Sequence, residues 1–205
     1  MAIGDVLLEL RNWQPLIGAA LGFGALTWGA LYNYRLGRKR DDAIREQEAR
    51  SVALGLYSEI NLISKQLASS ANSVGSWFMR AGISGSGLPS YFSDGFVLPE
   101  PTLFRALAPK VGMLPPDVLM SVTRFYGYYG EALSHLPKIH DTPESPIGYG
   151  VEWFLGPAVS AIDEVQSALR EIERMGRIRE AAPKPDLEQA RKALRMQDDI
   201  YPSEG

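Results

Sequence analysis

The chain has 205 residues, with 24 acidic and 21 basic side chains and a net charge of −3. This length suffices for one membrane span and one modest domain with its own core. The near balance of charge excludes a broad basic surface, so no nucleic-acid partner is expected. Cysteine is absent, which excludes disulfides, thiol catalysis and thiolate metal sites and leaves packing to hold the core.

Residues 13–34 are the most apolar part of the chain. They read WQPLIGAALGFGALTWGALYNY, twenty-two residues without an ionisable side chain. A helix rises about 1.5 Å per residue, so this length just spans the roughly 30 Å hydrocarbon core of a bilayer. The stretch predicts a transmembrane helix. The alternative is a buried helix of a soluble protein, because glycines and a threonine interrupt the apolar run.

Basic residues follow this stretch and predict its orientation. Only Arg11 precedes it, whereas a cluster follows directly, formed by Arg35, Arg38, Lys39 and Arg40. The positive-inside rule then places the N-terminus outside and the C-terminal domain in the cytoplasm of a bacterial inner membrane. The cluster either contacts anionic lipid headgroups or only sets the topology. Residues 1–12 are expected at the outer interface or frayed, and they do not resemble a cleaved signal peptide.

Small residues recur along one side of the predicted span. They are separated by four, three and four positions, which places them on one helical face: Gly18, Gly22, Ala25 and Gly29. Such a face lets a second helix approach closely, so it is a candidate surface for homo-oligomerisation. The alternative is that glycine is simply common in membrane helices.

Three later segments carry apolar residues at alternating steps of three and four, the pattern of helices that pack against partner helices. The segments are 39–71, 116–136 and 151–180. Together they predict an all-α protein in which the membrane helix continues into a three- or four-helix bundle over residues 35–182. A short helix over 102–108 is expected to start with Thr102 as its cap. Residues 183–205 are expected to form a C-terminal tail with a short helix over 186–196, docked or loose.

Residues 72–101 are predicted to form a long loop, because glycine and proline are too dense there for a helix. The loop contains three aromatic residues that either plug one end of the bundle or contact a protein partner: Tyr91, Phe92 and Phe96. Its glycines match neither the GK[ST] ending of a P-loop nor the dinucleotide-binding pattern.

No pattern of catalytic or metal-binding residues is present. His135 and His140 are the only histidines, and their spacing across Pro137 is not a recognised ligand pattern. The tyrosines at 126, 128 and 129 are expected to pack in the core with their hydroxyls at its rim. We therefore expect no enzyme activity, no cofactor and no metal.

Two segments resemble a known family. LRNWQPLIGAALGFGAL resembles the WQxLI-type opening of small proteobacterial single-span inner-membrane proteins. LFRALAPKVGMLPPDVLMSVTRFYGYY is similar to their later segment, a GxLP turn and a helix bearing Phe-Tyr. The resemblance implies bacterial origin and a membrane anchor. It carries over no functional residues, because none are established for that family.

The sequence thus favours a membrane-anchored, non-enzymatic scaffold or interaction protein, which contacts membrane lipid and either a protein partner or a second copy of itself. One alternative is a sensory or transport-accessory subunit that binds a small apolar ligand. A further alternative is a phage-derived lysis accessory, although there the basic residues should precede the span.

Overall fold

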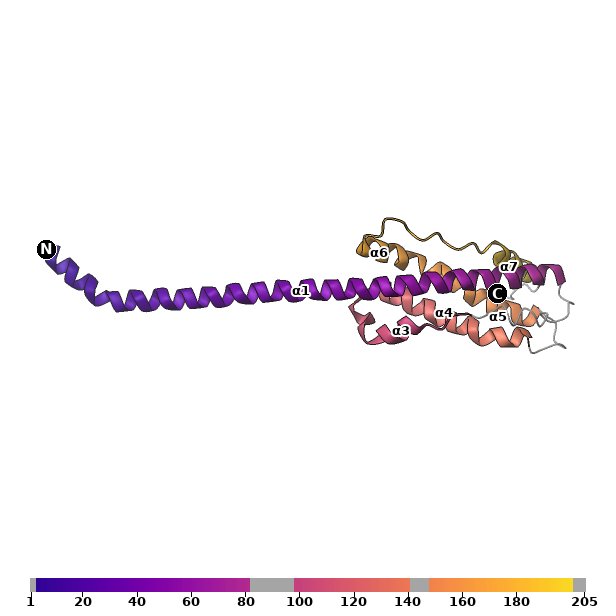
Figure 1. Cartoon of the computed structure of the whole chain (residues 1–205), viewed down its shortest axis with the longest axis horizontal. Helices are drawn as coiled ribbons and strands as arrows, with labels where there is room; N and C mark the ends of the chain where they lie inside the picture. The colour runs from indigo at the N-terminus through magenta and orange to yellow at the C-terminus, as the bar shows by residue number, and fades with distance from the viewer. Residues whose placement is uncertain (1–2, 82–97, 141–147, 201–205) are drawn as a thin grey trace. The chain divides into compact units, whose positions relative to one another are not determined.

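The computed structural model describes residues 3–81, 98–140 and 148–200 and shows an all-helical protein, which confirms the predicted class (Figure 1). The chain divides into two compact units, Met1–Gln47 and Glu48–Gly205. The first helix, α1 (Ile3–Ala81), belongs to both units. The predicted continuity between the apolar stretch and the following helix is therefore confirmed.

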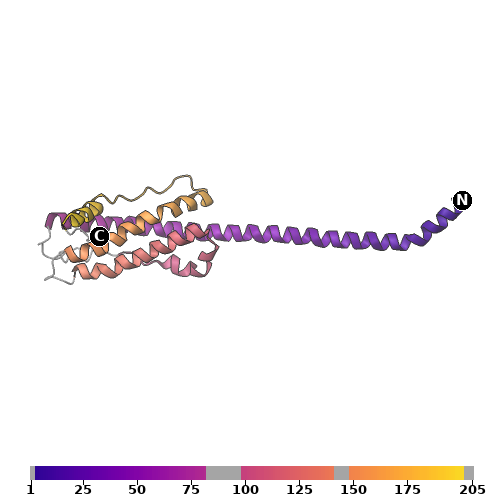
Figure 2. The ribbon, with the colours of Figure 1, turned by 180° about the vertical axis from the view of Figure 1, so that it is seen from behind.

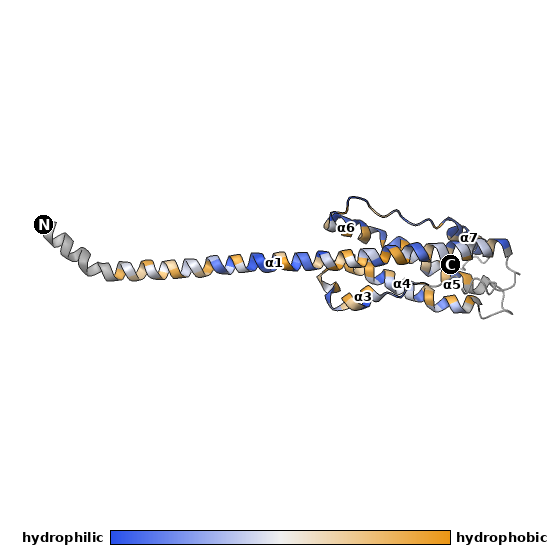
Figure 3. Cartoon of the chain, in the orientation of Figure 1, coloured by the Kyte–Doolittle hydropathy of each residue, from blue (hydrophilic) through white to orange (hydrophobic). Residues whose placement is uncertain are grey.

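Within the first unit, α1 changes from apolar to charged residues along its length (Figure 3). The charged part, residues 35–47, is almost entirely exposed. Opposite charges recur there at i, i+4 spacing, as between Asp41 and Arg45, which helps a solvated helix to stay formed. This part of α1 is stable as a helix without a buried face.

Among the residues that the structure describes, no helix combines the length and the apolar character needed to cross a membrane. The structure thus gives no support to the span predicted over residues 13–34, which stays a prediction.

In the second unit, one face of α1 forms the centre of the core. The predicted face there is buried from Ala53 to Leu67. The helix does not end near residue 71, as the sequence analysis expected, but continues to Ala81. Val74 and Phe78 continue the buried face, so the packing of residues 72–81 stabilises the helix more than Gly75 destabilises it. The predicted loop over 72–101 is therefore wrong for its first ten residues, and residues 82–97 lie outside the described part.

Helix α4 (Pro116–His140) packs beside α1 and α5 (Figures 1 and 2). All six residues of its predicted face are buried: Val118, Val122, Phe125, Tyr129, Ala132 and Leu136. The helix was expected to end before Pro137 but continues through it. Pro137 itself is exposed, and Ile139 beyond it is buried, so the last turn is held by packing despite the missing N–H of the proline.

The third long helix is divided into α5 (Gly148–Glu164) and α6 (Gln166–Gly176), with the break at Val165. Its predicted face is nevertheless buried throughout: Val151, Leu155, Ala158, Ile162, Val165, Leu169 and Ile172. Because the buried face continues across Val165, the interruption leaves the core intact.

Helix α6 ends at Gly176, earlier than the expected Glu180, because the chain forms a Schellman motif there. Ile178 N–H donates to Glu173 O at 3.0 Å and Arg177 N–H to Arg174 O at 3.2 Å. Arg177 takes the left-handed conformation with φ 53°, which a side chain makes costly. Gly176, one position earlier, lies close to α1: a Cβ there would be 2.7 Å from Leu54 Cδ2, so the Leu54 side chain would have to shift.

Helix α7 (Glu188–Ile200) is docked rather than loose, and Figures 1 and 2 both show it beside the end of α1. Asn72 holds its start: its Oδ1 accepts from the N–H groups of Gln189 and Ala190, and its Nδ2 donates to Asp186 O. Gly75 permits the close approach, since a Cβ there would lie 2.7 Å from Gln189 O. Ala190 and Ala193 are fully buried in the contact.

The segment between α1 and α4 contains α3 (Thr102–Leu107) and a 3-10 helix, η1 (Ala108–Met113). Thr102 does not cap α3, as had been expected. Pro101 occupies the cap position and supplies no side-chain hydrogen bond. The free N–H groups are instead bonded by a distant side chain, Glu59 of α1.

Substitution of Arg177 by glycine is expected to stabilise the protein. Glycine adopts the left-handed conformation without a Cβ clash, so the free energy of unfolding should rise by about 1 kcal/mol. Urea unfolding of the full chain measures the change. Arg177→Ala is the matched control, because it removes the same side chain but keeps the Cβ. An equal gain in both variants would show that the guanidinium, and not the backbone conformation, is unfavourable.

Candidate functional site

The predicted helix-association face lies on α1 in the first unit and is uncovered. Ala25 is exposed, and a Cβ added at Gly18, Gly22 or Gly29 would meet no atom within 4 Å. No side chain of the described residues occupies the space beside these glycines. Association through this face therefore stays a prediction.

Large apolar side chains around this face are also exposed, by 55% to 76%. They are Leu16, Leu21, Phe23, Leu26, Trp28, Leu31, Tyr32 and Tyr34. At 100° per residue these positions cover about two thirds of the helix circumference and leave free the side that carries Gly18, Gly22, Ala25 and Gly29. Such a surface is unfavourable in water, because apolar side chains there remain hydrated.

The four basic residues predicted to set the topology, Arg35, Arg38, Lys39 and Arg40, are all exposed on α1. They follow the apolar residues directly. The structure thus presents an apolar surface and a cationic one next to each other along a single helix.

Two groups of predicted residues are not placed by the structure. Tyr91, Phe92 and Phe96, the candidate partner loop, lie outside the described residues. His135 contacts Trp153, with ring centroids 5.3 Å apart, whereas the side chain of His140 is outside the described part. Among the described residues, no three potential metal ligands come together.

The structure reveals a polar cluster around Glu59 that sequence reasoning missed. The carboxylate is only 7% exposed. Its Oε1 accepts from Leu103 N–H at 2.6 Å, and its Oε2 accepts from Phe104 N–H at 2.9 Å and from the Tyr126 hydroxyl at 2.6 Å. These donors satisfy a buried charge that would otherwise be very costly. In the sequence, the one indication of this cluster was that Glu59, an acidic residue, lies directly beside the apolar face of α1.

Aromatic rings complete this cluster. Phe104 stacks on Tyr126 with ring centroids 3.9 Å apart, and Phe125 meets Tyr126 edge-on at 5.1 Å. The Tyr129 hydroxyl donates to Pro99 O at 2.6 Å. Tyr126 and Tyr129 pack in the core as predicted, whereas Tyr128 is only partly buried against it. The hydroxyls of Tyr126 and Tyr129 bind inside the protein instead of lying at the rim.

Burial and the nearby negative charge change the acidity of these phenols. Burial first, and then the Glu59 carboxylate, raise the pKa of Tyr126 far above its ordinary value. The same two causes raise the pKa of Tyr129 to about 12. Both phenols are therefore neutral hydrogen-bond donors at physiological pH.

A second polar group joins α1 to the end of α6. The Tyr57 hydroxyl donates to Glu173 Oε1 at 2.8 Å and accepts from Ala182 N–H at 2.9 Å. Burial, followed by the contact with Glu173, outweighs the Ala182 hydrogen bond and raises the pKa of Tyr57. Arg50 donates to Gly176 O at 2.6 Å. These contacts fix the connection that leads to α7.

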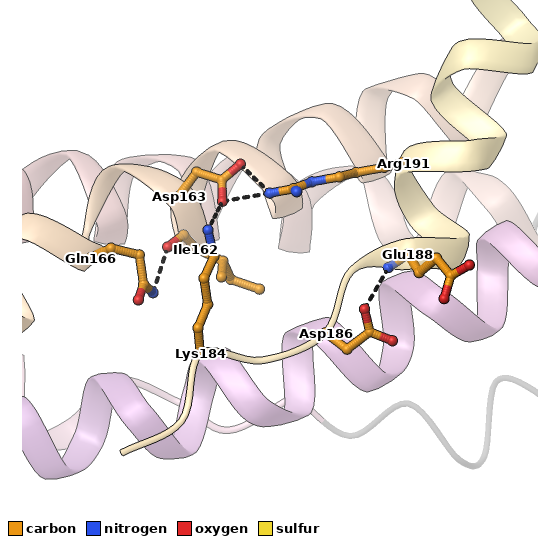
Figure 4. Close-up of polar contacts among 7 residues, drawn as sticks. All are labelled: Ile162, Asp163, Gln166, Lys184, Asp186, Glu188 and Arg191. Carbon is orange, nitrogen blue, oxygen red and sulfur yellow. Dashed lines mark hydrogen bonds and ion pairs between the residues drawn. The ribbon is translucent and has the colours of Figure 1, made fainter. Parts of the chain in front are cut away.

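Figure 4 shows how Asp163 of α5 binds two cations from this connection and from α7. Its carboxylate pairs with Lys184 at 2.9 Å and with Arg191 at 2.7 Å. All three side chains are about 40% to 50% exposed, so each pair contributes little on its own. Their arrangement nevertheless orients α7 along α5.

A surface recess of about 370 Å³ lies between the start of α4 and α6, lined by residues that include Asp117, Ser167 and Glu171. Its lining is mixed, with two carboxylates beside Pro115, Val118 and Ala168, and it is open to solvent. This recess is therefore not the apolar cavity that the ligand-binding alternative requires.

Taken together, these features define an all-helical bundle protein whose α1 exposes large apolar side chains between Leu16 and Tyr34. Comparison of the chain with protein-family models, with curated proteins and with solved structures finds no match. The resemblance to proteobacterial inner-membrane proteins stays a prediction.

The phenol pKa values predict a loss of stability in alkali. The pKa of Tyr129 is about 12 in the fold and about 10 in the unfolded chain, so its contribution is complete below about pH 10 and is lost as the pH rises towards 12. Urea unfolding at a series of pH values should show this decline. The Tyr129→Phe variant should show a shallower one. Tyrosinate absorbance reports when the tyrosines ionise. If every tyrosine in the folded chain ionised at its ordinary pKa, the prediction would be contradicted.

Proposed function

We propose that this protein is a single-span membrane protein that holds a helical bundle at the cytoplasmic face of a bacterial inner membrane. The observation that carries the proposal is the apolar surface of α1 in the first unit, where eight large side chains between Leu16 and Tyr34 are at least 55% exposed. Transfer of such a surface from water to hydrocarbon is strongly favourable, at roughly 25 cal/mol per Å². A lipid bilayer is the environment that this surface fits.

Three further features of the sequence support the proposal. The complete stretch from residue 13 to residue 34 contains no ionisable group, and it includes the strongly apolar Ile17. Aromatic residues flank it, with Trp13 before and Tyr32 and Tyr34 near its end. The exposed basic residues at 35–40 then suit the anionic cytoplasmic surface of a membrane.

The polar backbone of this region also suits a membrane. Residues 16–34 are helical throughout, so their backbone groups are bonded within the helix. Thr27 is the one aliphatic hydroxyl residue among them, and its Oγ1 donates to Phe23 O at 2.8 Å; the phenols of Tyr32 and Tyr34 lie at the end of the stretch. A helix can enter hydrocarbon only when its polar groups are satisfied in this way.

We further propose that the role of the bundle is to bind a protein rather than to catalyse a reaction. The described part of the bundle assembles no metal-ligand group, and the described polar clusters each join one element of the fold to another. The candidate contact is the loop that carries Tyr91, Phe92 and Phe96, and association through the Gly18, Gly22, Ala25 and Gly29 face is the alternative.

Vesicle flotation tests the membrane span. The purified full chain should float with vesicles that contain anionic lipid, whereas the double variant Leu21→Arg, Leu26→Arg should not. Each central arginine costs about 2.5 to 3.5 kcal/mol on insertion scales, and the two lie on different sides of the helix, so neither can be hidden by rotation.

Ile44→Arg is the matched control, because Ile44 is also an exposed apolar residue of α1 but lies beyond the basic cluster. This variant should float like the natural chain. Flotation of the double arginine variant would contradict the span. A reporter fused after Gly205 tests orientation, and activity of a periplasmic reporter there would reverse the proposed topology.

Affinity purification from native membranes tests the interaction surface. The double variant Tyr91→Ala, Phe92→Ala should lose a protein that co-purifies with the natural chain, because the loop loses two aromatic contacts. Met120→Ala is the control, since Met120 is an exposed apolar residue on α4. If the loop variant keeps its helicity and all of its co-purifying proteins, the loop is not the contact.

A further inference from the structure

Residues 98–113, which we call the strap, come before α4 in the chain and are held differently from the rest of the described bundle. The strap contains residues 98–101, α3 and η1, and no residue of either helix is buried. Leu114, directly after it, is only 4% exposed, and the buried face of α4 begins there. The strap therefore covers the core without supplying a fully buried side chain.

Polar contacts hold the strap at its N-terminal half. Glu59 accepts from the N–H groups of Leu103 and Phe104 at 2.6 and 2.9 Å, and the Tyr129 hydroxyl donates to Pro99 O at 2.6 Å. Because α3 lacks a side-chain cap of its own, the Glu59 carboxylate acts as its cap from another helix. The Tyr126 hydroxyl in turn holds Glu59 in position at 2.6 Å.

Apolar contacts of the strap are limited to partly buried side chains. Leu98, Phe104, Leu107 and Val111 pack against the core without being fully covered. Phe104 lies flat on the Tyr126 ring at 3.9 Å, and Leu107 lies over Gly55 of α1, close enough that a Cβ there would be 3.2 Å from Leu107 Cδ1. The strap can lose these contacts while the core of the bundle stays packed.

When the strap opens, no polar group is left buried without a hydrogen-bond partner. Glu59 and the hydroxyls of Tyr126 and Tyr129 would gain water in place of their strap partners, and the Tyr126–Glu59 hydrogen bond lies outside the strap. The buried faces of α1, α4, α5 and α6 would remain in contact. A segment with few buried apolar side chains and polar contacts that water can replace is the kind that opens before the whole fold does.

We propose that the strap opens and closes over α1 and α4 as one unit while the bundle stays folded, and that the Glu59 carboxylate holds it closed. We call this device the latch. The open latch exposes Glu59, Tyr126 and Tyr129 on neighbouring faces of α1 and α4. All of these residues belong to the second unit, so the latch does not depend on the proposed membrane span.

Amide hydrogen exchange of the full chain tests the latch. In the natural chain, amides of residues 103–107 should exchange faster than those of Val122 and Phe125 in α4. In Glu59→Gln, strap exchange should rise by roughly ten- to hundredfold, because the neutral amide loses the charged acceptor and one of its two oxygens. Exchange at Val122 and Phe125 should not change.

Two further variants make the test specific. Tyr126→Phe keeps both backbone contacts of Glu59 and should give a smaller increase in the strap alone. Tyr57→Phe removes a hydroxyl that holds the end of α6, and it should leave strap exchange unchanged.

The latch is wrong if strap amides in the natural chain exchange as slowly as those of α4. It is equally wrong if Glu59→Gln accelerates exchange in α4 by the same factor as in the strap, or if that variant loses the helicity of the bundle. Each of those results would show that Glu59 stabilises the whole fold rather than only the closed state of the strap.

Discussion

One face of α1 carries the core of the second unit, and the other elements depend on its burial. Leu56, Ile60, Ile63 and Leu67 are completely inaccessible to solvent on this face. Removing one such leucine or isoleucine side chain from a core typically costs about 2 to 5 kcal/mol, a large part of the stability of a small domain. Because this face continues to Val74 and Phe78, it is long enough for α4 and α6 to be held near Glu59 and Tyr57 and for α7 to be held further along, at Asn72.

Polar side chains beside that face decide which element is held where. Tyr57 binds the end of α6, Glu59 binds α3 and α4, and Asn72 binds the start of α7. Each of them satisfies backbone N–H groups of a segment that cannot bond them within itself. Apolar burial alone would permit several alignments of these elements along α1. The specific donors and acceptors select one alignment. The close approaches at Gly75 and Gly176 favour glycine over residues with a side chain at these two positions.

The two units place different demands on the same helix. In the second unit α1 is stabilised by a buried apolar face, and between residues 35 and 47 it is stabilised as an exposed, charged helix. Before that, its large apolar side chains are exposed and have no partner of their own kind within the described chain. That contrast is the physical basis for the proposed membrane span. It also separates the proposed anchoring function from the latch, since the latch involves only residues from Gly55 onwards.

The sequence by itself determined the helical class, the continuity of the first helix and the buried faces of the three long helices, because burial follows the three-four periodicity that a single helix imposes. It did not identify further core residues such as Phe78, Leu114 and Phe154. Ala49, which is only partly buried, is the one exception among the predicted faces. Helix ends were predicted less well: α1 passes residue 71, α4 passes Pro137 and α6 ends at Gly176. Those ends, the docking of α7 and the Glu59 cluster were decided by the tertiary structure. The docking of α7 and the Glu59 cluster depend on contacts between residues more than 40 positions apart, such as Glu59 with Phe104 and Asn72 with Ala190, and local periodicity contains no information about which distant backbone group a polar side chain will meet.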